Sequence, residues 1–242
     1  MIRWLESGED FPDVATACAQ GSATPGLLAA GAQLDTATLL RAYGAGIFPW
    51  FTDGQPVLWW SPDPRMVLQP GDFKMHRSFR RKLRDFLADP SCEVRIDAAF
   101  AEVIRACASS PRRGQHGTWI VPKMQQAYIK LHQDGHAHSV ETWIDGQLAG
   151  GLYCVALGRA VFGESMFSRT SGASRIALAA LVALCRQHGV ESIDCQQETS
   201  HLALLGAREI RRSDFCRHIA AAQAEAPALW KFQTVYWNQL RS

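Results

Sequence analysis

The sequence predicts an α+β fold in which helices pack on a mainly antiparallel sheet. Three observations indicate it: strand-like runs at 138–144, 147–157 and 161–167 separated by short turns, an amphipathic stretch from Ser171 to His188, and a returning strand at 190–196. The chain has 242 residues, of which 47% are hydrophobic and 20% charged. This composition is typical of a folded globular protein with one large core or two modest domains.

The first part of the chain is expected to form a small domain of its own. Residues 22–33 are rich in small side chains and lead into a short helix that Asp35 can cap and Gly44 or Gly46 can end. Residues 47–65 contain four prolines and three tryptophans, which predicts extended chain and turns, with a strand at 57–60. We therefore expect an N-terminal domain over residues 1–70 and a larger domain over 71–242.

A basic amphipathic helix is predicted from His76 to Leu87. Its apolar positions have helical spacing and are Phe79, Leu83, Phe86 and Leu87. The opposite face carries a stripe of arginines at Arg77, Arg80, Arg81 and Arg84. Such a stripe is either an ordinary solvated face or a nucleic-acid contact, and the formal net charge of +2 means that any RNA contact requires a local patch of this kind.

Further helices and turns follow from their end signals. The segment 98–109 is predicted to be helical with Asp97 as its cap, and the segment 122–133 begins with Pro122 and stops near Gly135. Asp145-Gly146 predicts a hairpin turn, and Gly189 is positioned to end the long helix. Short helices are expected at 200–205 and 213–222.

Compartment and metal content are judged from what the sequence lacks. No run approaches the roughly 20 apolar residues needed to span a bilayer, and the start of the chain is acidic, so we expect a cytoplasmic protein. Seven cysteines without a CxxC pair argue against a disulfide framework or a zinc ribbon. His136 and His138 could join Glu141 or Cys154 around a metal, but this spacing is that of ordinary polar residues, and no metal or cofactor is expected.

Three polar residues lie where strands would otherwise be apolar. Glu164 interrupts an apolar strand end, where a carboxylate costs free energy unless it is paired or used. The period of two places Asp194 and Gln196 on one face of their strand, which indicates either a cleft or a structural polar network. The same alternation places Cys195 on the opposite face as a buried, inert thiol.

The segment from Arg169 to Ser174 follows a strand and opens a helix. It partly matches the loop that binds the CoA pyrophosphate in N-acetyltransferases, although Ser174 stands where Gly or Ala is usual. Exposed amides at a helix N-terminus do bind phosphates. A CoA-dependent N-acetyltransferase is therefore one interpretation of the sequence. A non-catalytic tRNA-binding module is a second.

Several blocks together resemble the bacterial leucyl/phenylalanyl-tRNA–protein transferases. They are GIFPWF (46–51), WWSPDPR (59–65), GTWI (117–120), GHAHS (135–139), GESMFS (163–168), IDCQ (193–196) and LGA (205–207). The resemblance implies a small N-terminal domain joined to an acyl-CoA-N-acyltransferase-like (GNAT) domain that uses aminoacyl-tRNA in place of CoA. It further implies transfer of Leu, Phe and, less, Met to the N-terminal amine of proteins that begin with Arg or Lys. Such transfer marks them for degradation, and the enzyme is expected to be a monomer.

The same resemblance suggests roles for individual residues. Asp194 and Gln196 match the family's catalytic pair, with Glu164 beside them. Trp50 and Trp119, with Tyr43 and Tyr128 nearby, match residues around the tRNA's terminal adenosine, and the donor side-chain pocket is expected to contain Met166, Leu178 and Ile193. The arginines of the helix from His76 resemble the tRNA-contacting patch. Val161 replaces a common aromatic residue, which suggests an enlarged donor pocket.

The expected chemistry requires no cofactor because an aminoacyl ester is already activated. The enzyme has to position the two substrates, accept a proton and stabilise the tetrahedral oxyanion. A neutral amide is a poor base, so Gln196 is expected to orient the attacking amine through its carbonyl while Asp194 orients Gln196. Glu164 would supply negative charge suited to an ammonium group.

Overall fold

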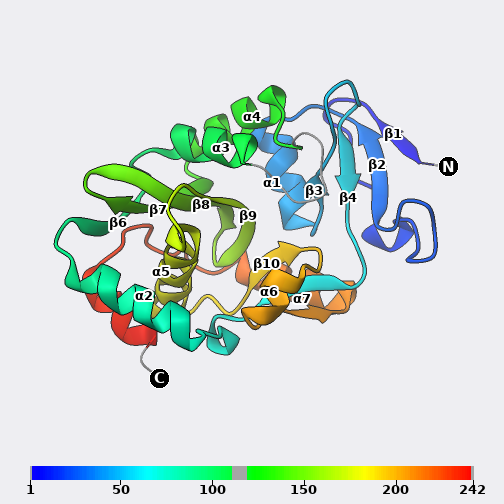
Figure 1. Cartoon of the computed structure of the whole chain (residues 1–242). Helices are drawn as coiled ribbons and strands as arrows, with labels where there is room; N and C mark the ends of the chain where they lie inside the picture. The colour runs from blue at the N-terminus through cyan, green and yellow to red at the C-terminus, as the bar shows by residue number, and fades with distance from the viewer. Residues whose placement is uncertain (1, 111–118, 241–242) are drawn as a thin grey trace.

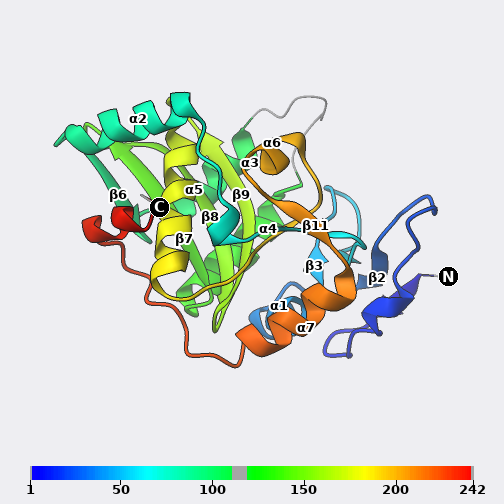
Figure 2. The same cartoon turned by 90° about the horizontal axis from the view of Figure 1, so that it is seen from below.

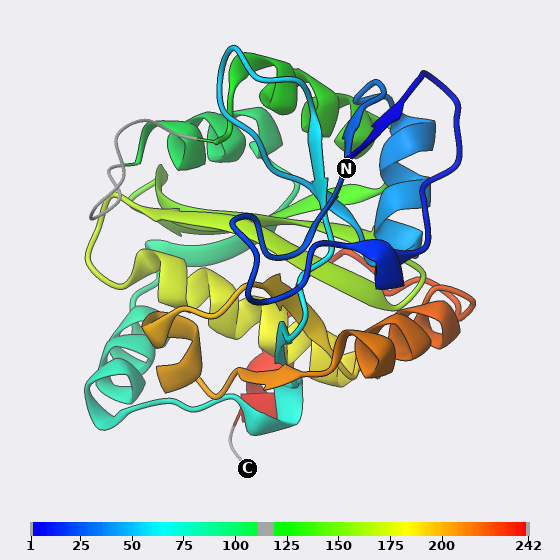
Figure 3. The ribbon, with the colours of Figure 1, turned by 90° about the vertical axis from the view of Figure 1, so that its right-hand side faces the viewer.

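A computed structural model describes residues 2–110 and 119–240, and it confirms the α+β class (Figure 1). The described residues form a four-stranded sheet near the N-terminus and a seven-stranded sheet on which most of the helices pack. Viewed from the side, the larger sheet is the middle of three layers (Figure 3). No helix among the described residues is long and apolar enough to cross a membrane.

The larger sheet is antiparallel except where β9 and β10 run parallel. In spatial order its strands are β11 (Arg208–Ile210), β5 (Arg65–Leu68), β10 (Ile193–Gln196), β9 (Ala160–Ser168), β8 (Gln147–Leu157), β7 (Ala137–Ile144) and β6 (Cys92–Ile96). The expected meander β7-β8-β9 is confirmed. Asp145 and Gly146 join β7 to β8 with φ of 51° and 70°, as a tight hairpin turn requires.

Helices cover both faces of this sheet (Figures 1 and 2). On one face lie α3 (Phe100–Ser109) and α4 (Pro122–Gln133), and on the other lie α2 (Arg77–Ala88) and α5 (Ala173–Gln187). Short helices complete the chain: α6 (Ser200–Leu204), α7 (Arg212–Ala222) and the 3₁₀ segments Val14–Thr16, Pro70–Asp72 and Thr234–Leu240. The predicted helices are confirmed to within one or two residues at their ends.

The close approach of α5 to the sheet depends on a glycine. A Cβ added to Gly150 on β8 would lie 2.6 Å from the Cβ of Ala173, the first residue of α5. Only a residue without a side chain allows the helix to begin at this distance from the sheet. The contact fixes the start of α5 beside the end of β9.

Two expected details of the helices are wrong. Asp97 does not cap α3: its φ is 58°, its Oδ1 accepts a hydrogen bond from the Ser139 amide at 2.8 Å, and Glu141 instead accepts one from the Ala99 amide at 2.7 Å. Leu87 is 44% exposed, so the apolar face of α2 is narrower than the spacing suggested. At the start of α3, tertiary contacts with β7 outweighed the local cap signal of Asp97.

The N-terminal sheet has the order β1 (Arg3–Leu5), β2 (Leu27–Gly31), β4 (Leu58–Trp60) and β3 (Phe48–Pro49). Helix α1 (Thr36–Gly44) lies beside it and is capped as expected, with Asp35 Oδ1 accepting from the Thr38 amide at 2.8 Å. The buried strand β2 lies in the run of small residues that predicted no strand. Strand β5 precedes residue 70, yet it pairs with β10 and β11 of the larger sheet.

Candidate active site

Two neighbouring cavities lie at the end of the larger sheet where β10 meets α6 and the N-terminal domain. The first has a volume of about 370 Å³ and the second about 240 Å³. They share one wall, which consists of Trp119, Glu164, Cys195, Gln196, Thr199 and Leu202. A molecule in either cavity would therefore contact the same polar groups.

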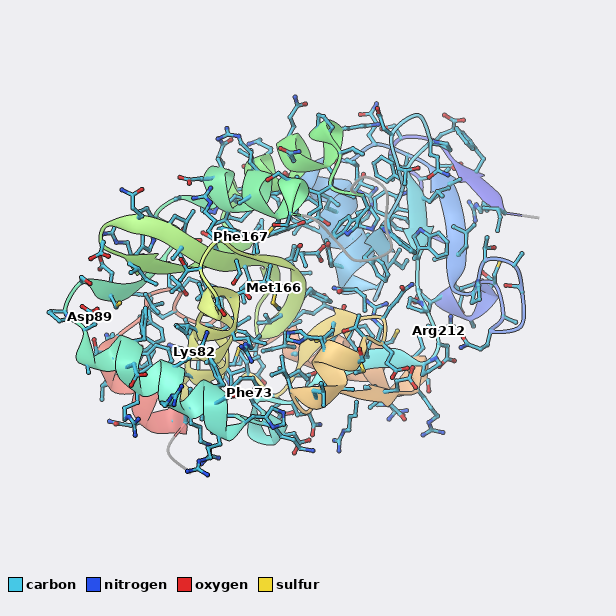
Figure 4. All side chains as sticks on the ribbon, in the orientation of Figure 1. Phe73, Lys82, Asp89, Met166, Phe167 and Arg212 are labelled. Carbon is cyan, nitrogen blue, oxygen red and sulfur yellow. The ribbon has the colours of Figure 1, made fainter. Side chains whose placement is uncertain are left out.

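The first cavity is predominantly apolar. Its remaining walls include Leu152, Met166, Leu178, Leu181 and Ile193. These residues come from β8, β9, α5 and β10, and Figure 4 labels Met166 on β9. All three residues expected in a donor side-chain pocket lie here. Val161 is not among the residues that line the cavity and is 2% exposed within the core.

The second cavity is closed by the N-terminal domain, which contributes Phe48, Pro49 and Trp50. Trp50 is held by Trp60, whose indole N–H donates to the Trp50 carbonyl at 2.7 Å and whose ring centre lies 5.4 Å from that of Trp50. Trp119 contributes to both cavities. Gly117 and Thr118, which belong to the same motif, lie outside the described residues.

Asp194 does not face the cavities directly but lies behind Gln196, with 1% of its surface exposed. Arg65, on the neighbouring strand β5, binds it through two parallel hydrogen bonds, Nε to Oδ1 at 2.8 Å and Nη2 to Oδ2 at 2.7 Å. Arg65 was not predicted as a site residue from the sequence. It could have been recognised as an arginine at the start of the apolar run Arg65–Leu68, because a buried charge requires a partner.

Gln196 is held by Asp194 in an uncommon backbone conformation with φ of 59°. Its amide N–H donates to Asp194 Oδ1 at 3.0 Å, and its side-chain Nε2 donates to Oδ2 at 3.4 Å. Because the nitrogen of the carboxamide donates to Asp194, its carbonyl oxygen is the group suited to accept a hydrogen bond from a substrate N–H. The expected pairing of these two residues is thus a direct contact.

The alternation that predicted this pair fails at Cys195. The pairing of β10 with β5 shifts register between Asp194 and Gln196, a bulge that brings Cys195 and Gln196 to the same cavities. Cys195 was expected on the opposite face. Burial raises the pKa of its thiol to about 12, so the thiol is protonated near neutral pH and is a poor nucleophile, as expected.

Glu164 lies at the junction of both cavities and is bound by tyrosines. The Tyr43 hydroxyl donates to its Oε1 at 2.7 Å, the Tyr128 hydroxyl lies 3.5 Å from its Oε2, and the two hydroxyls contact each other. Burial is the main cause that raises the pKa of Glu164 to about 8. Tyr43 and Tyr128 are fully buried and support Glu164 from behind, and burial also raises their own pKa values well above the usual range.

The arginine stripe of α2 is exposed and lines a depression of about 800 Å³ that shares no residue with the two cavities. Its members lie on the outer side of the helix, and Arg80 Nε donates to the Met75 carbonyl at 3.0 Å. Lys82, labelled in Figure 4, connects α2 to the loop before α5, where its Nζ donates to the carbonyl and hydroxyl of Ser171 at 2.9 and 2.8 Å.

The loop that resembles a CoA site is already hydrogen-bonded within the chain. The Ser174 amide donates to the Ser168 hydroxyl at 2.9 Å, and the Ala173 amide donates to the Thr170 carbonyl at 3.0 Å. Amides that are bonded in this way are not available to a pyrophosphate unless those bonds break. The geometry therefore lends the CoA interpretation no support.

One of the two histidines considered as metal ligands, His138, is engaged in other contacts. His138 Nδ1 lies 2.7 Å from Asp97 Oδ2, and its ring stacks on Trp230 at 4.1 Å. Glu141 accepts from the Ser139 hydroxyl and the Trp143 indole. Over residues 2–110 and 119–240 no group of three or more His, Cys, Asp or Glu side chains is arranged to hold a metal ion.

Two cavities with a common polar wall are the arrangement expected of a group-transfer enzyme, which must hold a donor and an acceptor side by side. Comparisons with known proteins agree. Residues 67–220 match the family model for leucyl/phenylalanyl-tRNA protein transferase, and residues 32–63 match the model for the N-terminal domain of that family. The chain belongs to this family and is a transferase.

Relatives extend over nearly the whole chain. The leucyl/phenylalanyl-tRNA–protein transferase of Albidiferax ferrireducens is 61% identical over 239 residues, covering 99% of this chain and 94% of the relative. That of Burkholderia pseudomallei is 56% identical over 232 residues, covering 96% and 91%. Among solved structures, FemX matches with a TM-score of 0.45 at 12% identity, covering 72% of this chain and 66% of its own. A GCN5-related N-acetyltransferase from Kribbella flavida matches with a TM-score of 0.35 at 12% identity, covering 68% and 56%.

Proposed function

We propose that the protein transfers Leu, Phe and, less efficiently, Met from aminoacyl-tRNA to the N-terminal amine of proteins that begin with Arg or Lys, marking them for degradation. The observation that carries this is the predominantly apolar cavity of about 370 Å³ whose lining includes the polar side chains of Glu164 and Gln196. A long side chain of the donor fits such a cavity, and its ester would then lie at the polar wall. Family membership supports the use of charged tRNA and a protein acceptor. We place the reaction in the cytoplasm, where charged tRNA is used.

The second cavity is assigned to the end of the tRNA and to the acceptor amine. Trp50 and Trp119 offer aromatic surface on which a terminal adenine can stack, a contact worth about 1–3 kcal/mol per base. The arginines Arg77, Arg80, Arg81 and Arg84 offer a separate surface for tRNA phosphates. We further propose that the enzyme acts as a monomer.

In the proposed reaction the acceptor nitrogen attacks the ester carbonyl carbon. A C–N bond forms, the C–O bond to the ribose breaks, and the ribose oxygen leaves with a proton from the attacking amine. Gln196, held by Asp194, accepts a hydrogen bond from the amine and directs its lone pair toward the ester. Holding both reactants in near-attack geometry supplies about 7–11 kcal/mol of the acceleration.

We assign to Glu164 the role of proton acceptor. The N-terminal ammonium of the acceptor must lose a proton before its nitrogen can attack the ester. An N-terminal ammonium has a pKa of about 7.7–8.0, and the pKa of Glu164 is about 8. Where Glu164 is ionised, transfer of the proton from the ammonium to its carboxylate is therefore nearly balanced in free energy. A bound Arg or Lys side chain favours the charged form of the carboxylate, since an opposite charge nearby stabilises it.

The test compares donors in parallel on one peptide that begins with Arg. We expect transfer from Leu-tRNA and Phe-tRNA, slower transfer from Met-tRNA, none from acetyl-CoA, and a rate with Val-tRNA about 10–200-fold below that with Leu-tRNA. Acetylation of the peptide would establish the CoA-dependent alternative. Binding of tRNA without transfer would establish a non-catalytic module, and equal transfer of Val and Leu would contradict the assignment of the apolar cavity.

A further inference from the structure

Arg65 joins three parts of the chain that are distant in sequence. Besides its two bonds to Asp194, its Nη1 donates to the Gly46 carbonyl at 3.1 Å. Its guanidinium lies over the rings of Phe48 and Phe215, 4.8 and 4.5 Å from their centres. The side chain is fully buried. All of its polar contacts are thus fixed by the protein and none by solvent.

The partners of Arg65 lead to two walls of the second cavity, one from the N-terminal domain and one from β10. Gly46 and Phe48 belong to the segment that continues into Trp50, which forms the wall from the N-terminal domain. Asp194 holds both the backbone and the side chain of Gln196, which forms the shared wall. One planar guanidinium therefore connects the two walls between which the substrates meet.

The energetics favour a positioning role over a purely stabilising one. A buried ion pair is weak support for stability, because the desolvation of both charges offsets most of their attraction and an apolar pair of similar size is often as stable. The pair does fix the orientation of the carboxylate, because the rigid, forked guanidinium of an arginine binds both carboxylate oxygens at once. Without that fork Asp194 could rotate, and the strained conformation of Gln196 would lose the acceptors that hold it.

We propose that Arg65 is a positioning residue for aminoacyl transfer. It fixes the carboxylate of Asp194, and through it the carbonyl of Gln196, at a set distance from the Trp50 wall. The proposal rests on the function proposed above. It assigns no contact between Arg65 and either substrate, and the apolar cavity that binds the donor side chain is built without it.

The first test is Arg65→Lys, which keeps the charge but loses the fork. Arg186→Lys serves as the matched control, because Arg186 is a half-buried arginine that donates to the Pro70 carbonyl at 2.9 Å and lines neither cavity. Both variants are expected to unfold at a lower temperature. At a temperature where both are folded, Arg65→Lys is expected to lower kcat about 100-fold while the KM for an aminoacyl-adenosine donor changes little. Arg186→Lys is expected to keep the wild-type kcat.

The second test is rescue of Arg65→Ala by a small guanidinium compound, at concentrations below those that unfold the protein. Methylguanidinium is expected to restore turnover saturably, and methylammonium is expected not to, since only the former can bind both oxygens of Asp194. Rescue by both cations equally, or a kcat for Arg65→Lys equal to that of the control, would overturn the proposal. If the wild type itself fails to transfer Phe from tRNA, the proposed function fails instead, so the two failures are distinguishable.

Discussion

Two carboxyl groups lie within one site, and the chain stabilises them in different ways. Asp194 is bound by a buried arginine at 2.7 and 2.8 Å, so its charge has a full counter-charge. Glu164 is bound by the hydroxyl of Tyr43, with that of Tyr128 beyond, and its surroundings raise its pKa to about 8. A phenol donates a hydrogen bond but supplies no counter-charge. The two acids are therefore equipped for different tasks.

This difference indicates which carboxylate exchanges a proton and which one orients its neighbouring side chains. A carboxylate fixed by a bidentate arginine is a rigid acceptor that orients its neighbours. A carboxyl group whose pKa lies near the working pH can take and release a proton. On this account Asp194 orients Gln196 and Glu164 exchanges protons with the acceptor ammonium.

The largest effect is expected when the orienting unit is broken. Gln196→Ala, Asp194→Asn and the double variant should each lower the single-turnover rate by a similar factor of about 100 or more, because residues that act as a unit are not additive. Donor affinity should change less than the rate. Rapid-quench measurement of peptide formation from Phe-tRNA checks this, and additive losses would contradict the unit.

The same variants separate catalysis from folding. Asp194 is buried against Arg65, so its loss should affect stability as well as the rate of transfer. Asp194→Asn leaves the arginine charge uncompensated and is expected to lower the free energy of unfolding by about 3–5 kcal/mol. Gln196→Ala, at the cavity surface, should leave it nearly unchanged. Equal destabilisation of both variants would mean that the pair is mainly structural.

The second carboxylate predicts a dependence of stability on pH. Between its ordinary pKa of 4.5 and its raised value of about 8, Glu164 is protonated in the folded chain and ionised in the unfolded one. The folded state then binds more protons, so this residue makes the free energy of unfolding fall as pH rises through that window, by at most about 5 kcal/mol. Urea unfolding of Glu164→Gln should lack this component. A wild type and variant with parallel pH profiles would show that Glu164 titrates alike in both states.

The smallest effect on chemistry is expected from the arginine stripe, which touches neither carboxylate. Arg80→Glu with Arg84→Glu should weaken binding of whole tRNA and lower its salt dependence by about two counterions. Reaction with aminoacyl-adenosine should be unaffected, because that donor carries no tRNA phosphates. Equal loss with both donors, or no loss with either, would make the stripe an ordinary solvated surface.

Local patterns predicted most of the fold. The meander β7-β8-β9 and the helices α1, α4 and α5 follow from periodicity, turn residues and caps, which are properties of neighbouring residues. The strands β2, β5, β6 and β11 were not predicted, because each is too short or too irregular to show a period and is defined by its partner strands. The predicted cap of α3 was wrong for the same reason, because Glu141 on β7 binds the Ala99 amide at the start of this helix.

The site was predicted in part, and the missing parts are contacts between distant segments. Asp194, Gln196 and Glu164 stood out as polar residues in apolar strands, and the structure brings all three together. Arg65 did not stand out, since it lies 129 residues from Asp194 in sequence. The bulge at Cys195 could not be read from the alternation because it depends on pairing with β5.

The distinction between the two carboxylates is tested most directly by the protonation of Glu164 itself. Difference infrared spectra of the wild type minus Glu164→Gln, recorded across the pH range that spans 4.5 and 8, isolate the carboxyl stretch of this one residue. The account predicts a protonated carboxyl band that persists through neutral pH and disappears with a midpoint near 8. This midpoint should shift to lower pH when a peptide that begins with Arg binds. A band that disappears with a midpoint near 4.5, and does not respond to the peptide, would contradict the proton-exchanging role of Glu164.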